Sequence, residues 1–145
     1  MDKRARGYYR RFYPITTRWM DNDIYGHVNN VTYYSYFDSA ANRFLIEDCG
    51  LDIHDGDIIG FVVSSGCEYL SPVAYPDALE AGLSIEKLGN SSVRYNIGIF
   101  RKDSDTASAH GYFVHVFVTR DQQKATPIPE GMRAAMAKIL VGETS

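Results

Sequence analysis

The chain has 145 residues, of which 45% are hydrophobic and 23% are charged, as in a folded globular protein rather than a disordered or fibrous one. Its length suits one domain, expected over residues 1–145. A net charge of −3 argues against nucleic-acid binding, and the apolar runs are too short to span a membrane. With no signal peptide evident, we expect a cytoplasmic protein that binds neither nucleic acid nor membrane.

A strand is predicted over residues 8–19, where aromatic and β-branched residues alternate with Arg. Pro14 within it marks a bulge or an edge position, because proline cannot donate a hydrogen bond to a neighbouring strand. A polar loop over residues 21–30 follows and ends in Asn30. Asn is a preferred N-cap residue, so we expect a helix to begin there.

That helix is predicted over residues 31–49, because bulky residues recur at spacings of three and four, and Gly50 then provides a stop. The recurring residues are Tyr34, Phe37, Ala41, Phe44 and Leu45. Further apolar residues widen the stripe, and they are Tyr33, Tyr36, Ala40 and Ile46. We therefore expect the helix to be covered on more than one side.

Four strands are predicted next, because apolar runs alternate with clusters of turn-forming residues. Their ranges are 58–70, 79–88, 92–101 and 107–120. Strands in succession predict an antiparallel meander. A short helix is expected over residues 130–140, with Met132, Met136 and Ile139 on one face. One long helix followed by an antiparallel sheet predicts an α+β fold in which the sheet wraps around the helix.

The sequence predicts no metal or nucleotide site. Cys49 and Cys67 form no Cys-x-x-Cys pair, and His54, His110 and His115 lack the spacing of metal ligands. His110 and His115 differ in parity, so their side chains should point to opposite faces of one strand. Glycine-rich phosphate loops and Gly-x-Ser-x-Gly are also absent from the sequence.

The loop carries the most informative pattern. Residues 21–30 read Asp-x-Asp-x-x-Gly-His-Val-Asn-Asn, followed by Tyr33 and by Tyr-Phe-Asp at 36–38. This pattern resembles the signature of the 4-hydroxybenzoyl-CoA thioesterase-like family of hotdog-fold proteins. A Ser-Pro strand end at 71–72 and a hairpin at 88–92 fall where that family has them, so the resemblance covers residues 8–130. It implies a hotdog fold, an antiparallel sheet wrapped around one long central helix.

The resemblance implies an acyl-CoA thioesterase in which Asp23 acts on the thioester and Asp21 supports it. A carboxylate placed just before a helix can attack a carbonyl or activate water, while free N–H groups at the helix start stabilise the oxyanion. By the family's geometry, the N–H of Asn30 or its neighbours receives that oxygen. Whether Asp23 is a nucleophile or a general base stays open. Composition alone would give these residues only turn and capping roles.

His27 is assigned an accessory catalytic role, as imidazole titrates near neutral pH. Substrate contacts are expected at Tyr25, Gly26, Tyr33, Ser64, Ser65, Gly89, Asn90, Ser91 and Ser92. Packing within a strand and a plain hairpin turn are the alternatives for the last six. Some family members have basic residues at the hairpin, whereas this chain has only Lys87 and Arg94 nearby. A substrate on acyl carrier protein is therefore an alternative to acyl-CoA.

The resemblance also implies a homodimer or homotetramer with the active site at the dimer interface. No cofactor is expected, since CoA is part of the substrate, and the acyl group is left open. A non-catalytic acyl-CoA-binding protein is the main alternative. A hydratase or dehydratase using His27 and Asp38 ranks last, because nothing else in the sequence supports that pair.

Overall fold

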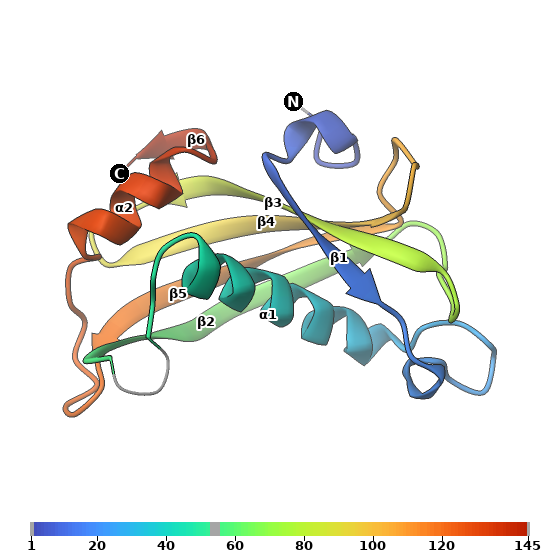
Figure 1. The fold of residues 1–145 in the computed structure, drawn as a ribbon, viewed down its shortest axis with the longest axis horizontal. Helices are drawn as coiled ribbons and strands as arrows, with labels where there is room; N and C mark the ends of the chain where they lie inside the picture. Colours follow the sequence, from blue (N-terminus) through green and yellow to red (C-terminus); the bar gives the residue numbers. More distant parts are fainter. Residues whose placement is uncertain (1, 53–55, 145) are drawn as a thin grey trace.

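The computed structural model describes residues 2–52 and 56–144, which form a six-stranded sheet with a helix along one face (Figure 1). The helices are α1 (Asn30–Glu47) and α2 (Glu130–Ala137). The strands are β1 (Arg11–Thr16), β2 (Ile58–Tyr69), β3 (Ala78–Leu88), β4 (Ser92–Arg101), β5 (Ala109–Thr119) and β6 (Leu140–Thr144). Two short 3-10 turns, η1 (Arg6–Tyr8) and η2 (Trp19–Asp21), flank β1. This α+β arrangement is consistent with the predicted hotdog fold.

The order of strands in the sheet is β1-β3-β4-β5-β2, and β6 pairs parallel to β3. Antiparallel hairpins join β3 to β4 and β4 to β5, as predicted. The prediction of a meander through four strands is wrong at β2, which pairs with β5 at the far edge. Short turns dictate the pairing of the strands they join. The longer connection over residues 70–77 does not, so β3 pairs with β1 and β4 instead.

The two ends of the chain differ from the predicted pattern. β1 covers only the middle of the predicted strand, and Pro14 lies exposed on this edge strand, in agreement with an edge position. The final helix ends at Ala137, and β6 follows it, a strand that the residue pattern did not predict. In the part of the chain that the structure describes, no helix has the length and apolarity to cross a lipid bilayer.

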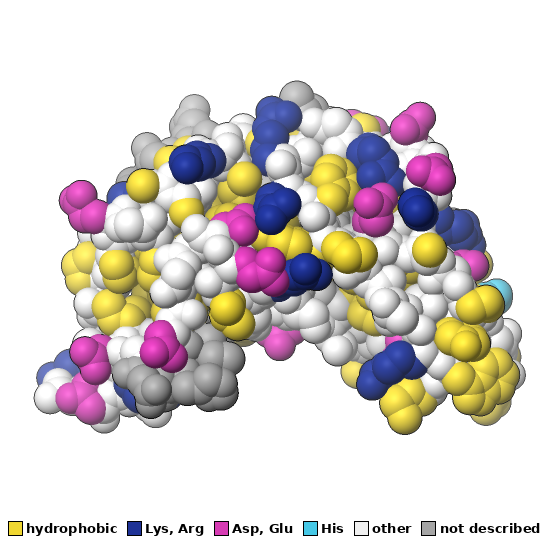
Figure 2. Space-filling model, viewed as in Figure 1, with side chains coloured by type: hydrophobic (Ala, Val, Ile, Leu, Met, Phe, Trp, Pro, Cys, Tyr) yellow, Lys and Arg dark blue, Asp and Glu magenta, His cyan; other side chains and the backbone are white. Residues whose placement is uncertain are grey.

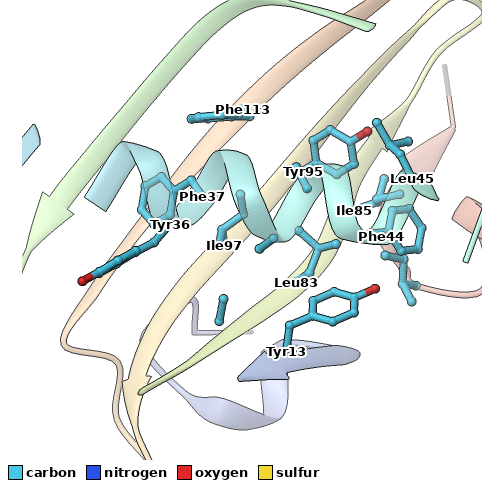
Figure 3. Packing of buried hydrophobic residues seen from close by; sticks show 14 of the residues in the cluster. Tyr13, Tyr36, Phe37, Phe44, Leu45, Leu83, Ile85, Tyr95, Ile97 and Phe113 are labelled. Carbon is cyan, nitrogen blue, oxygen red and sulfur yellow. The ribbon is translucent and has the colours of Figure 1, made fainter. Parts of the chain in front are cut away.

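α1 packs its apolar face against the sheet, as Figure 3 shows for Phe37 and Phe44. Its buried residues are Tyr33, Tyr36, Phe37, Ala40, Ala41, Phe44 and Leu45. Tyr34 is half-buried against the same core, whereas Ile46, predicted to widen the stripe, is 42% exposed. Truncating a fully buried Phe such as Phe37 to Ala costs about 3–5 kcal/mol. This packing therefore fixes the position of the helix.

Gly111 on β5 sets how closely α1 and β2 approach the same strand. A Cβ at this position would lie 2.6 Å from the ring of Phe37 and would collide with the carbonyl oxygen of Gly66 on β2. Only glycine leaves room for both contacts. The first half of α1 and the last residues of β2 are thereby held side by side.

His115 is a polar residue inside this core. It is 2% exposed, and its Nδ1 lies 3.2 Å from the hydroxyl of Tyr95, which is fully buried. Burial lowers the pKa of His115 from 6.5 to about 4, because the imidazolium cannot be solvated there. The folded protein thus holds this side chain neutral.

We predict that the free energy of unfolding falls as pH drops from 6.5 to about 4, because the unfolded chain binds a proton to His115 and the folded chain does not. The loss of unfolding free energy that is due to this residue approaches about 3 kcal/mol near pH 4. Urea denaturation across this pH window, compared between wild type and His115→Phe, measures it. An equally steep pH dependence in the variant would contradict the assignment.

Candidate active site

A hollow of about 400 Å³ lies at the start of α1, between the preceding loop and the end of β2. It is lined by Asp23, Tyr25, His27, Val28, Asn30, Tyr33, Tyr69, Leu70, Ser71 and Pro72. Five predicted site residues thus meet in one place, namely Asp23, Tyr25, His27, Asn30 and Tyr33. Concave sites of this size take small-molecule ligands.

The buried carboxylate of Asp21, only 2% exposed, anchors the loop. One carboxylate oxygen accepts hydrogen bonds from the Tyr36 hydroxyl at 2.8 Å and the Arg18 backbone N–H at 2.9 Å. The other oxygen accepts two hydrogen bonds from the Arg18 guanidinium, at 3.0 and 3.1 Å. Burial alone would raise the pKa of Asp21, but the bonds from Tyr36 and Arg18 hold it below its usual value. The charged carboxylate therefore ties η2 to α1.

The loop closes on itself through backbone bonds. The carbonyl of Asp21 accepts the N–H of Asn29 at 2.8 Å, which joins the two ends of the loop. Inside it, the Asp23 N–H donates to the carbonyl of His27 at 2.9 Å. Gly26 has a φ of +83°, a left-handed conformation that glycine adopts without steric cost. Gly26 therefore shapes the turn and does not itself line the hollow.

The carboxylate of Asp23 is half-buried at the wall of the hollow. Its Oδ1 accepts the N–H of Tyr25 at 2.9 Å, and its backbone carbonyl accepts the N–H of Gly26 at 3.1 Å. These two bonds fix the turn of the backbone and the orientation of the Asp23 side chain. His27 lines the same hollow from an exposed position, within the same loop.

The first turn of α1 supplies hydrogen-bond donors to this end of the molecule. Asn29 is the N-cap, and its side-chain oxygen accepts the N–H of Val31 at 3.0 Å. Asn30, predicted to be the cap, is instead the first helical residue. Among the described residues, the N–H of Asn30 meets no hydrogen-bond acceptor. It lies at the positive end of the helix dipole.

Tyr69, at the end of β2, closes one wall, and the sequence analysis did not single it out. Its hydroxyl donates to the carbonyl of Asn30 at 3.1 Å, and its ring contacts that of Tyr33 edge-on at 5.1 Å. Burial raises the pKa of Tyr69 to about 12, so its hydroxyl is protonated at neutral pH. The Ser-Pro pair at 71–72 was the only sequence signal near this wall.

Apolar side chains surround the mouth of the hollow. Figure 2 shows them gathered at the lower right, over η2 and the loop that precedes α1. The most exposed are Trp19, Met20, Ile24, Tyr25 and Val31, each at least 72% exposed. Exposed apolar patches on soluble proteins mark places where a ligand or partner binds.

The other predicted substrate residues lie away from the hollow within one chain. Ser64 and Ser65 are exposed in the middle of β2, opposite Val114 and Phe113. The hairpin of Gly89, Asn90, Ser91 and Ser92 lies at the far end of the sheet, where Ser92 pairs with Val116. Arg133 donates to the carbonyls of Gly89 and Asn90 at 2.6 and 3.0 Å. That contact gives the hairpin a structural role.

The histidines are dispersed. His115 is buried in the core, while His110 lies on the other face of β5, 3.1 Å from the carboxylate of Glu68, as their parity predicted. His54 lies outside the described residues. Within residues 2–52 and 56–144, no three His, Cys, Asp or Glu side chains are grouped to hold a metal ion.

Comparisons with known proteins relate most of the chain to one family. Residues 17–136 match the family described as the thioesterase-like superfamily. The crystal structure of PA5185 from Pseudomonas aeruginosa is 51% identical, with a TM-score of 0.94 over 97% of this chain and 99% of that one. PA2801 from the same species is 30% identical, with a TM-score of 0.81 over 86% of this chain and 96% of that one.

A more distant structure shares the fold. Slr0204, a 1,4-dihydroxy-2-naphthoyl-CoA thioesterase from Synechocystis, is 19% identical, with a TM-score of 0.78 over 87% of this chain and 94% of that one. A search of curated proteins finds no significant match. The predicted relationship to hotdog-fold thioesterases is confirmed by the family match and by these structures. The chain belongs to the thioesterase-like superfamily.

Proposed function

We propose that this protein hydrolyses an acyl-CoA thioester in the hollow at the start of α1, with Asp23 as the acting carboxylate. The observation that carries the proposal is that Asp23 and Asn30, whose N–H meets no acceptor in the described part of the chain, line one hollow. A carboxylate and a backbone donor on opposite sides of a carbonyl group are the two parts that thioester hydrolysis needs.

In the proposed reaction, the thioester carbonyl lies between these two groups. Its oxygen gains negative charge in the transition state, and the Asn30 N–H donates to it. One such donor is worth about a hundredfold or more in rate. Asp23 either attacks the carbonyl carbon, giving an anhydride that water then opens, or takes a proton from the attacking water. Both routes break the carbon–sulfur bond and release a free acid and the CoA thiol.

The remaining residues of the hollow would hold the substrate. Tyr25 offers exposed aromatic surface to the acyl group and the buried Tyr33 forms part of the wall, while Gly26 holds the turn that carries Asp23. His27, which lines the same hollow, is assigned an accessory role as proton donor to the leaving thiol. The reaction as proposed needs water and no cofactor or metal, and it takes place in the cytoplasm. CoA is the proposed carrier, and acyl carrier protein is the alternative.

A second copy of the chain would complete the site. β2 is an edge strand that is exposed along most of its length, with Phe61, Val62 and Val63 each at least 39% exposed. Long apolar edge strands bind another strand unless they are protected. Pairing of β2 with the β2 strand of another protomer would cover these residues. It would also bring the partner's Ser64 and Ser65 near the apolar rim of the hollow.

We predict that Asp23→Asn lowers kcat by about 10²- to 10⁴-fold, because the amide can act neither as nucleophile nor as base. The measurement is thiol release from a panel of aryl-, short-chain and long-chain acyl-CoAs. Asp38→Asn, an exposed carboxylate on α1, is the matched control and keeps wild-type activity. Saturable acyl-CoA binding without turnover by the wild type would instead support the non-catalytic alternative.

We predict that Tyr36→Phe lowers kcat about tenfold, because the loss of one hydrogen bond to the buried Asp21 carboxylate loosens the loop that carries Asp23. Tyr34→Phe, on the same helix, is the control. Kinetics at temperatures well below unfolding separate positioning from global stability. Unchanged kcat in Tyr36→Phe would show that the anchor is dispensable for activity.

We predict that Val63→Asp, which places a charge on the exposed edge of β2, converts the wild-type oligomer to a monomer with reduced turnover. Ile46→Asp, on the exposed side of α1, leaves the oligomer intact. Light scattering after gel filtration gives the mass of each. A wild type that is monomeric and fully active would refute the assembly.

A further inference from the structure

A second hollow, of about 240 Å³, lies on the face of the sheet that points away from α1. Side chains alternate along a strand, so Arg94 on β4 and Tyr112 on β5 face away from the core residues Tyr95 and Phe113. The lining residues are Lys3, Gly66, Cys67, Glu68, Arg94, Asn96, His110, Gly111 and Tyr112. This hollow shares no residue with the one at the start of α1.

Two cations in this hollow share one carboxylate. Lys3 Nζ lies 3.1 Å from one oxygen of Glu86, and Arg94 Nε lies 2.9 Å from the other. The Arg94 contact is an ion pair without hydrogen-bond alignment, since its buried Nε–H meets no acceptor among the described residues. Lys3 and Arg94 together carry one positive charge more than the Glu86 carboxylate that they share.

The guanidinium of Arg94 is held in a fixed plane. Its Cζ lies 4.0 Å from the centre of the Tyr112 ring. That ring lies against Gly66 of β2, where a Cβ would come within 2.6 Å of it. A stacked guanidinium presents its N–H groups in a fork that matches the oxygens of phosphate or carboxylate. The site is thus preorganised before any ligand binds.

The other polar walls leave the hollow open to an anion. Glu68 is the one acidic lining residue, and its side chain is 75% exposed beside the His110 imidazole. The buried Asn96 amide donates to the Tyr8 hydroxyl at 2.7 Å, which fixes the floor. Lys3 and Arg94 are the two cationic side chains that line the hollow, beside the Glu86 carboxylate that both contact and the outward-facing Glu68.

We propose that this hollow binds an anion of the phosphate class through Lys3 and Arg94. One source of the phosphate is the nucleotide end of CoA, because the hairpin at Gly89 has no basic residue to bind it. The other source is a free phosphorylated metabolite. Only the first source rests on the proposed thioesterase function. The anion site itself stands independently of that function.

Isothermal titration calorimetry with inorganic phosphate and with adenosine bisphosphate tests the site without turnover. Arg94→Gln and Lys3→Gln are each expected to weaken binding about tenfold or more, since each removes a charged partner. Lys87→Gln is the matched control, because Lys87 pairs with Arg94 across the two strands but does not line the hollow. This variant loses the same charge and is expected to bind phosphate with wild-type affinity. Absent binding to the wild type, or equal affinity in all three variants, would overturn the proposal.

Steady-state kinetics then identify the source of the phosphate. A raised KM of Arg94→Gln for acyl-CoA, with an unchanged KM for acyl-pantetheine, assigns the site to the CoA nucleotide. Lost phosphate binding with both KM values unchanged assigns it to a separate phosphorylated ligand. Both results support the anion site. If no variant or wild type turns over any thioester, the calorimetry still decides whether the site exists.

Discussion

The buried carboxylate of Asp21 is the contact on which the proposed active site depends. A charge removed from water must be paired. Arg18 and Tyr36 supply the partners from η2 and from α1. The loop between those elements is therefore held at both ends, and Asp23 lies two residues from the anchor. A strong structural constraint thus fixes the position of the reactive carboxylate.

The start of α1 is held just as firmly from the other side. Phe37 packs into the narrow space that Gly111 leaves on β5, and the same glycine admits β2 alongside. Tyr69 at the end of β2 then reaches the carbonyl of Asn30. The edge strand that we propose to pair with a second protomer is thereby connected to the backbone donor of the site. Assembly and catalysis would be coupled through this one strand.

Much of this could be predicted from the sequence because the informative residues are contiguous. Asp23, His27 and Asn30 stand within eight consecutive residues, and the turn-forming residues on either side of residues 92–101 predicted the observed bounds of β4. The place of β2 beside β5 could not be predicted, because it depends on a long connection rather than on a turn. Tyr69 was missed for the same reason. The hollow around Arg94 joins Lys3 to strands far along the chain, a contact that no local pattern records.

The most direct test of the central claim is a crystal structure with an uncleavable acyl-CoA analogue, in which a methylene group separates the carbonyl from sulfur. The account predicts that the analogue's carbonyl oxygen lies within hydrogen-bond distance of the Asn30 N–H, with the carboxylate of Asp23 beside the carbonyl carbon. A carbonyl bound elsewhere, with Asp23 in contact with neither the acyl group nor an adjacent water, would contradict it.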